Sequence, residues 1–224
     1  MHVGADEAGK GPVLGPMIAA AVRAPPSSIP AGIDDSKRLA PARRERLERR
    51  LREHPDVAIG VAAIEPAAID DPEADMNRLT VAAQARALAA VVREGEEVVV
   101  DAGDVSESRF ARRVREAVAA RGVEIDVVAE HGADERHPVV SAASVVAKVE
   151  RDRRMAEIDD EYAPLVVGDG VSGVGSGYPG DPATRAFLRA YVDRYGDVPD
   201  CARRSWSTCA DVLAAAGQSS LEEF

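Results

Sequence analysis

Cysteine, lysine and aromatic residues are scarce in this chain of 224 residues, and long apolar runs are missing. The two cysteines, Cys201 and Cys209, form no CxxC or Cys/His cluster, so the sequence offers no cysteine-based metal site and a reducing cytoplasm is expected. No apolar run approaches the ~18 residues that span a bilayer, which argues against a membrane protein. The first residues already read as a strand, so no signal peptide is expected.

The shortage of lysine accompanies a large excess of acid. Three lysines stand against 25 arginines, and the net charge of −11 is spread along the chain. Such a charge opposes compaction through self-repulsion unless salt screens it, and at ~1 M salt the Debye length is only ~3 Å. We therefore expect a protein that works in concentrated salt, as halophile proteins do. The same charge argues against simple electrostatic binding of polyanions.

The rest of the composition, 46% hydrophobic and 30% charged, is typical of one large globular domain or of a domain with a smaller appendage. Alternating or continuous apolar runs predict strands at 2–8, 14–23, 57–64, 96–101 and 123–129. Helices are expected at 40–53, 73–93, 106–121, 139–154, 183–195 and up to about 216, with a helical turn at Pro66. This order of elements indicates an α/β fold.

The stretch from Val3 to Pro12 places two adjacent carboxylates, Asp6 and Glu7, where the first strand is expected to end. Neighbouring strand residues point to opposite faces, so both reach one centre only if the strand stops or bulges there, which Gly9 permits. A P-loop is rejected because carboxylates inside the loop would repel phosphates. A hydrolytic Mg²⁺ or Mn²⁺ site and a solvated turn remain as alternatives.

A third carboxylate follows a β-branched run. Val98-Val99-Val100 reads as a buried parallel strand that delivers Asp101 at its carboxyl end, where ligands gather in open α/β sheets. The alternative for Asp101 is a plain turn residue. Asp104 and Ser106 are expected to cap the next helix.

Polar residues are dense again between 130 and 138, ahead of a mostly apolar helix. His131 and His137 are candidates for metal ligands or general acids, although each alone is a weak signal. On the helix, Ser144 and Lys148 share a face. A buried helix with serine hydroxyls bonded to its own backbone is the alternative reading. The glycine-rich segment from Gly168 to Pro182 is expected to form a mobile loop.

Together these motifs resemble type 2 ribonucleases H, the ribonuclease HII family, in order and over nearly the whole chain. The matching stretches are Val3-Gly-Ala-Asp6-Glu7-Ala-Gly9-Lys10-Gly11-Pro12, Asp35-Ser36-Lys37-x-Leu39, Val98-Val-Val-Asp101, Ala133-Asp134 with Pro138-Val-Val-Ser141-Ala-Ala-Ser144-x-x-Ala-Lys148-x-x-Arg151-Asp152, Gly175-Ser-Gly-Tyr178-Pro179-x-Asp181-Pro182, and Arg204-Ser205-Trp206. The last two resemble the archaeal branch. Each stretch alone is weak evidence for the family, but all of them occurring in the same order along one chain is specific to it.

The resemblance implies a ribonuclease H-like α/β fold, a mixed five-stranded sheet flanked by helices, followed by a mostly helical C-terminal segment. We expect a catalytic core at 1–165, a helical substrate-binding segment at 166–216 and a flexible tail at 217–224. The implied activity is endonucleolytic cutting of the RNA strand of RNA–DNA hybrids and of single ribonucleotides embedded in duplex DNA. A monomeric cytoplasmic enzyme is expected.

The resemblance also assigns residues. Asp6, Glu7, Asp101 and Asp134 would be the catalytic carboxylates that hold Mg²⁺ or Mn²⁺ for two-metal hydrolysis. Gly9, Lys10 and Gly11 would read the ribose 2′-OH, mainly through their backbone, and Tyr178 would stack beside the sugar at the scissile junction; Ser141 and Lys148 would contact the substrate. Many relatives have arginine in place of Lys10. The competing hypothesis is a non-catalytic nucleic-acid or nucleotide binder, which would hold a hybrid in EDTA without cutting it.

The tail adds one partner to these expectations. Gln218, Leu221 and Phe224 are spaced i, i+3 and i+6, so one helical turn would present a polar plug and two apolar anchors on one side. The pattern resembles the motif that tethers replication and repair enzymes to the DNA sliding clamp, but the usual second aromatic residue is missing. Apart from this helical turn on the clamp, the last helix is expected to end near Ala216 and the tail to be disordered.

Overall fold

The computed structural model describes residues 1–33, 39–166 and 171–222, with the backbone alone for 219–222. The motif residues Asp35, Ser36 and Lys37 and the terminal Phe224 lie outside this part of the chain. The chain divides into two compact units. The first comprises Met1–Lys10, Met17–Ile64 and Asp75–Arg151, and the second comprises Gly11–Pro16, Glu65–Ala74 and Asp152–Phe224. This division differs from the expected boundary at residue 165 in two ways. The change from the first unit to the second, at Arg151 and Asp152, falls within one continuous helix, and two earlier segments, Gly11–Pro16 and Glu65–Ala74, belong to the second unit.

The first unit contains a mixed five-stranded sheet with the strand order β3-β2-β1-β4-β5. The strands are β1 (His2–Ala8), β2 (Met17–Ala24), β3 (Ala58–Ile64), β4 (Glu97–Asp101) and β5 (Asp126–Glu130). β1, β2 and β3 pair antiparallel, while β4 pairs parallel with both β1 and β5. The expected sheet is thereby confirmed. β2 begins later than expected because Gly15 turns the chain with a φ of 77°.

Seven α-helices are present in the described residues. They are α1 (Pro41–Glu53), α2 (Pro66–Ile69), α3 (Met76–Ala89), α4 (Glu107–Ala119), α5 (Pro138–Tyr162), α6 (Pro182–Tyr195) and α7 (Ser207–Glu222), with 3₁₀ turns η1 (Pro26–Ser28), η2 (Ala133–Glu135) and η3 (Ala163–Val166). None of them is long and apolar enough to cross a membrane. Both cysteines are buried as free thiols.

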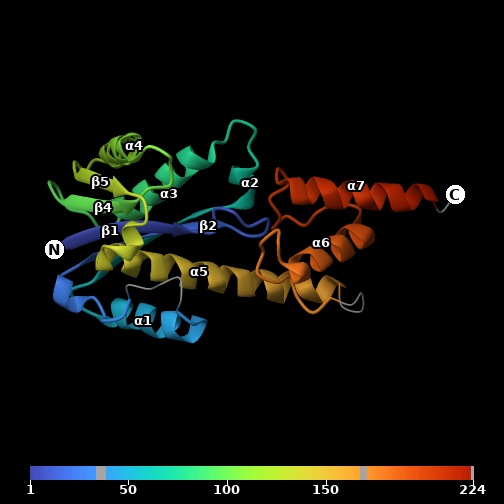
Figure 1. Ribbon diagram of the computed structural model, residues 1–224, viewed down its shortest axis with the longest axis horizontal. Helices are drawn as coiled ribbons and strands as arrows, with labels where there is room; N and C mark the ends of the chain where they lie inside the picture. Colours follow the sequence, from blue (N-terminus) through green and yellow to red (C-terminus); the bar gives the residue numbers. More distant parts are fainter. Residues whose placement is uncertain (34–38, 167–170, 223–224) are drawn as a thin grey trace. The chain divides into compact units, whose positions relative to one another are not determined.

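Helices cover both faces of the sheet in the first unit. α3 and α4 lie on one face, and α1 and the first part of α5 lie on the other (Figure 1). The α5 side forms a continuous apolar core in which alternate residues of β2, Ile18, Ala20 and Val22, pack with Leu47 and Leu51 of α1. Two-sided burial explains why the strands read as continuous apolar runs.

Gly4 in the middle of β1 allows α5 to approach the sheet closely. A Cβ atom built on Gly4 would lie 2.8 Å from a methyl of Val140 and 2.9 Å from the Val140 backbone nitrogen. Only glycine avoids this clash, so β1 and the first turn of α5 stay in direct contact. The close approach places the Asp6–Glu7 end of β1 against the helix that carries Ser144 and Lys148.

The second unit is mostly helical, as expected. Its core gathers apolar side chains from the end of α5, from α6 and α7 and from the segment after Lys10, including Leu14, Phe187, Leu188 and Cys209. Gly196, in the left-handed region with a φ of 78°, ends α6 as a C-cap.

Two helices are longer than the sequence predicted. α5 continues to Tyr162 instead of ending near 154, and α7 continues to Glu222 instead of ending near Ala216. The expectation that residues 217–222 lack regular structure was therefore wrong. Gly217 disfavours a helix by only ~1 kcal/mol relative to Ala, which one residue inside an established helix tolerates.

Candidate active site

Asp6 and Glu7 lie side by side near the end of β1 but point to opposite faces of the sheet. β1 neither stops nor bulges at these residues, because it pairs with β2 without interruption through Ala8. Asp6 reaches Ser144 and Lys148 on the α5 face, while Glu7 accepts a 2.6 Å hydrogen bond from Gln84 on the α3 face. The strand ends at Ala8, as expected, and Gly9, with a φ of 86°, turns the chain directly after it, so Asp6 and Glu7 keep the alternating directions of strand residues.

Asp101 joins these two carboxylates from the neighbouring strand. β4 runs parallel to β1 with Ala5 opposite Val100, which places Asp101 next to Asp6 at the carboxyl end of both strands. One oxygen of Asp101 accepts a 2.8 Å hydrogen bond from the Ala133 nitrogen. The alternative of a plain turn residue does not describe Asp101, since its charge acts on both Asp6 and Glu7.

The three carboxylates, of which Asp6 is buried and Glu7 and Asp101 are half-buried, repel one another. Burial raises the pKa of Asp6 well above its ordinary value, the charges of Glu7 and Asp101 raise it further, and the Ser144 hydrogen bond and the Lys148 charge oppose the rise. Burial raises the pKa of Glu7 to about 7, and the Asp101 charge adds to this rise against the Gln84 hydrogen bond and Lys10. The cluster is therefore poised to accept protons or cations.

Asp134 approaches the same end of the sheet from η2. It is buried, with 4% of its surface exposed, and it follows directly after Ala133, which binds Asp101. Its own carbonyl accepts a hydrogen bond from the Ser141 hydroxyl. Within the part of the chain that the structure describes, no group of three or more His, Cys, Asp or Glu side chains is arranged so that it could hold a metal ion.

Two residues that the resemblance assigned to the substrate have structural contacts here. Ser141 is fully buried and supports η2 through Asp134. Lys148 donates a 2.7 Å hydrogen bond to the Ser144 hydroxyl, which in turn bonds Asp6. Both side chains therefore support residues of the acidic cluster, and their contact with substrate stays a prediction.

The Lys10 side chain turns back into the first unit. Its ammonium donates to the Gly103 carbonyl at 2.5 Å and to the Asn77 amide oxygen at 3.4 Å. Lys10 therefore ties the end of β1 to the loop that follows Asp101. That this turn reads the substrate through its backbone stays a prediction of the resemblance.

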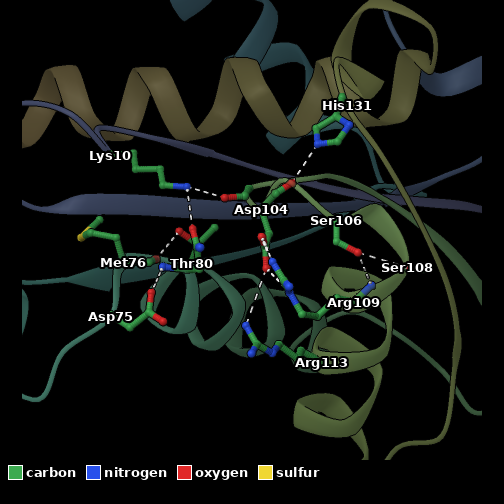
Figure 2. Close-up of polar contacts among 12 residues, drawn as sticks. Lys10, Asp75, Met76, Thr80, Asp104, Ser106, Ser108, Arg109, Arg113 and His131 are labelled. Carbon is green, nitrogen blue, oxygen red and sulfur yellow. Dashed lines mark hydrogen bonds and ion pairs between the residues drawn. The ribbon is translucent and has the colours of Figure 1, made fainter.

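The loop after Asp101 is fastened at a second point by Asp104 (Figure 2). Arg109 donates to the two Asp104 carboxylate oxygens at 2.9 and 2.6 Å, and the ring of His131 lies 2.8 Å from the Asp104 carbonyl. Ser106 is the N-cap of α4, while Asp104 pairs with Arg109 and also accepts backbone hydrogen bonds from Val105 and Ser106 just before the helix. His131 therefore contacts the loop, and its role as a metal ligand or general acid stays a hypothesis.

Replacing Asp104 with Asn is expected to lower the Tm at pH 7. The Arg109 hydrogen bond holds the pKa of Asp104 down at about 2, below the ordinary value near 3.9 of an unfolded chain. A depressed carboxylate stabilises the fold above its unfolded pKa and loses that effect as the pH falls through its folded pKa. The Tm difference between wild type and Asp104→Asn should shrink between about pH 4 and 2. Asp126→Asn, an exposed change on β5, is the control, and an equal Tm at pH 7 would contradict the prediction.

Sequence reasoning missed Gln84 and the true role of Asp104. Both act through contacts with distant parts of the chain, which no local pattern encodes. A signal for Gln84 was present in the spacing: Thr80 and Gln84 form a polar i, i+4 pair on a helical face otherwise made of alanine, valine and leucine.

In the second unit, the segment after Lys10 is bonded to the loop that carries Tyr178. The Val13 and Leu14 nitrogens both donate to the Gly177 carbonyl, at 2.7 and 3.2 Å. The Trp206 indole donates to the Gly11 carbonyl at 3.3 Å. Gly11 and Tyr178 are thereby held in one hydrogen-bonded framework, and Tyr178 itself is 46% exposed.

The guanidinium of Arg203 anchors this framework from within. Arg203 is fully buried, donates to the Gly15 carbonyl at 3.0 Å and lies 5.2 Å from the centre of the Trp206 ring. Asp70 holds the same connection from the other side, because its carboxylate accepts hydrogen bonds from the backbone of Arg204 and Ser205. The motif around Trp206 thus fixes the Gly11–Pro16 segment.

The sheet order, with acidic residues at adjoining ends of the central strands β1 and β4, is that of the ribonuclease H-like fold class. Comparison with known sequences agrees: the model of the family described as Ribonuclease HII matches residues 3–209. The chain belongs to the ribonuclease HII family. Ribonuclease H activity on RNA–DNA hybrids, which depends on a divalent metal, follows from this membership.

Individual relatives support both the family and the fold. Ribonuclease HII of Haloarcula marismortui is 57% identical over 100% of both chains. The crystal structure of ribonuclease H2 from Pyrococcus horikoshii matches with a TM-score of 0.82 at 34% identity, covering 96% of this chain and 98% of that one. A ribonuclease HII of Archaeoglobus fulgidus, solved in complex with PCNA, matches with a TM-score of 0.79 at 33% identity over 95% and 96% of the chains. The expected kinship with halophilic archaea is confirmed by the first relative.

Proposed function

We propose that the chain cuts RNA–DNA hybrids and single ribonucleotides embedded in duplex DNA, at a divalent-metal site formed by Asp6, Glu7, Asp101 and Asp134. The products are a 5′-phosphate and a 3′-hydroxyl. Mg²⁺ or Mn²⁺ is the cofactor, since both prefer carboxylate oxygen ligands. When bound, two such ions activate a water and stabilise the leaving oxygen of a phosphodiester.

The observation that carries this proposal is the mutual repulsion of Asp6, Glu7 and Asp101. Burial raises the pKa of both Asp6 and Glu7, the Asp101 charge adds to both shifts, and the Glu7 charge adds to that of Asp6. Such a group of carboxylates is stabilised by protons or cations. The donor set therefore fits a hard divalent ion in its chemistry. The positions of these carboxylates match a single metal site only in part, because the Asp6 and Glu7 side chains lie on opposite faces of β1.

The chain's own side chains keep Asp6 in position. The Ser144 hydroxyl bonds Asp6 and receives a hydrogen bond from Lys148, so a short polar relay leads from α5 to the carboxylate. The positive charge of Lys148 offsets part of the negative charge of Asp6. On the far side, the Ala133 nitrogen fixes one oxygen of Asp101.

Substrate recognition is assigned to the turn at Gly9, Lys10 and Gly11 and to Tyr178. The 2′-OH is the group that distinguishes RNA from DNA. The Gly11 carbonyl accepts a hydrogen bond from the Trp206 indole. In this proposal Gly11 therefore contacts the 2′-OH through its backbone N–H. An open space surrounds the Cα of Gly11, where an added Cβ would meet nothing within 4 Å.

Replacing Tyr178 with Ala is expected to slow cleavage at a single embedded ribonucleotide by about 5- to 150-fold. This range corresponds to the ~1–3 kcal/mol that base–aromatic stacking contributes by alanine substitution. Tyr178→Phe, which keeps the ring, should retain most of the rate. Tyr195→Ala is a matched control, because Tyr195 is also about half exposed, at 49%, but lies on α6 away from the Gly177 framework. An unchanged rate for Tyr178→Ala would make Tyr178 a plain loop residue.

Divalent dependence separates this function from the competing hypothesis of a non-catalytic binder. The full chain, in molar KCl, is mixed with a labelled RNA–DNA hybrid in EDTA and then given Mg²⁺ or Mn²⁺. The proposal expects an intact hybrid in EDTA and a cut RNA strand after the metal is added. A chain that retains the hybrid but never cuts it with either metal would be a binder.

We also propose a sliding clamp as a partner of the C-terminal tail. The Archaeoglobus fulgidus relative was solved with PCNA, which supports the proposal for this chain. Gln218 and Leu221 both fall within the backbone of α7 at a spacing of three residues, as a helical motif requires. A clamp would raise the local concentration of the enzyme on DNA where salt weakens phosphate contacts.

A further inference from the structure

Gln84 is the one carboxamide that touches the acidic cluster among the described residues. It lies on α3 and is fully buried between alanines 83 and 85 and near Leu88. Its side-chain nitrogen donates to one Glu7 oxygen at 2.6 Å and to the Asp101 carbonyl at 3.1 Å. Its own amide oxygen is buried without a hydrogen-bond partner in the described chain.

These contacts give a neutral donor to a site crowded with negative charge. A buried amide oxygen without a partner is costly, so apolar packing alone would favour leucine or methionine at this position. A lysine or arginine here would neutralise Glu7 and compete with a cation. A glutamine instead fixes one Glu7 oxygen, leaves the charge of the carboxylate in place, and ties it to the strand end that carries Asp101.

We propose that Gln84 is a positioning residue for metal binding: it holds the Glu7 carboxylate in register with Asp101. The proposal rests on the metal site proposed above and assigns to α3 a supporting role in it. Partners that orient metal-binding carboxylates commonly change metal affinity by about 10- to 100-fold when they are removed. Because Gln84 binds neither the metal nor the substrate, its loss should act on the metal affinity and not on the rate at saturating metal.

The test compares Gln84→Met, which keeps the length of the side chain and removes its donor, with Thr80→Val. Thr80 is also fully buried on α3, one turn earlier, and its hydroxyl bonds the Met76 carbonyl, so the control removes a buried polar group without touching a carboxylate. Mn²⁺ binding to the full chain is measured by calorimetry in molar KCl. Gln84→Met should raise the Mn²⁺ Kd by about 10- to 100-fold, and Thr80→Val should leave it unchanged. At saturating Mn²⁺, Gln84→Met should cleave a hybrid with a kcat close to that of the wild type.

A second measurement needs no variant and remains valid if Gln84→Met folds poorly. The chain has only three carboxamide side chains, Asn77, Gln84 and Gln218, so the NH₂ signals of an ¹⁵N-labelled protein are readily resolved. During a Mg²⁺ titration, the Gln84 signals should shift with the same midpoint as metal binding, while those of Gln218 stay fixed.

The outcomes separate the two proposals. An unchanged Kd in folded Gln84→Met, or Gln84 signals that do not move while Mg²⁺ binds, would overturn the positioning role and leave the metal site standing. If Asp6→Asn also binds Mn²⁺ as the wild type does, the carboxylates are not the ligands and the proposed metal site itself fails.

Discussion

Replacing Asp6 with Asn is expected to abolish cleavage of an RNA–DNA hybrid and, in EDTA, to raise the Tm of the protein. Cleavage fails because the proposed metal site loses a central carboxylate. The Tm rises because Asp6 is buried beside the negative charges of Glu7 and Asp101. Without a cation these charges repel the Asp6 carboxylate, and the neutral Asn side chain removes that repulsion. Near-normal turnover of Asp6→Asn would remove the catalytic role assigned to this residue.

The pH dependence of this effect has a definite sign. The pKa of Asp6 in the fold is raised well above its ordinary value, so the folded state binds the proton more tightly than the unfolded chain. The ionised Asp6 therefore destabilises the metal-free fold increasingly as the pH rises above the unfolded pKa. The Tm gain of Asp6→Asn should be largest at alkaline pH and smallest near pH 4. Asp126→Asn, an exposed change, should show normal activity and no such gain.

Deleting residues 218–224 is expected to abolish binding to the sliding clamp while leaving the cleavage of a short free duplex unchanged. The deletion removes Gln218, Leu221 and Phe224, the three residues of the proposed motif, but no residue of the acidic cluster. Clamp binding is measured by surface plasmon resonance in concentrated KCl, and cleavage is measured on a short hybrid without the clamp.

Point variants make the same test without shortening α7. Leu221→Ala combined with Phe224→Ala should lose the apolar anchors, whereas Ser219→Ala, between the motif positions, should bind the clamp as the wild type does. A tail-deleted protein that binds the clamp with unchanged affinity would contradict the assignment of the tail.

Strong local patterns predicted the sheet. The β-branched run Val98–Val100 specified a buried strand ending in Asp101, and the structure places that strand, β4, parallel to β1. The apolar stretch after Pro16 likewise became β2, buried along its whole length. A strand that is buried on both faces needs a continuous apolar run, so the run in the sequence is enough to predict that the strand lies inside the sheet.

The partners of the acidic side chains could not be predicted in this way. The period of a strand already places Asp6 and Glu7 on opposite faces, as the regular pairing of β1 with β2 shows, but it does not tell which side chains meet them there. Gln84, Asp104 and the Lys10 contact with Gly103 depend on how distant segments meet. The end of α7 was missed because one unfavourable residue, Gly217, does not stop a helix that has already formed.

The most direct test of the proposed function uses duplex DNA with one embedded ribonucleotide, beside an identical duplex without it. Both are incubated with the full chain in molar KCl, with Mg²⁺ or Mn²⁺ and with EDTA, and the cut position and end groups are mapped. We predict one cut at the ribonucleotide, with 5′-phosphate and 3′-hydroxyl ends, only with a divalent metal and only in the ribonucleotide-containing duplex. Equal cutting of both duplexes, cutting in EDTA, or no cutting with either metal would contradict the account.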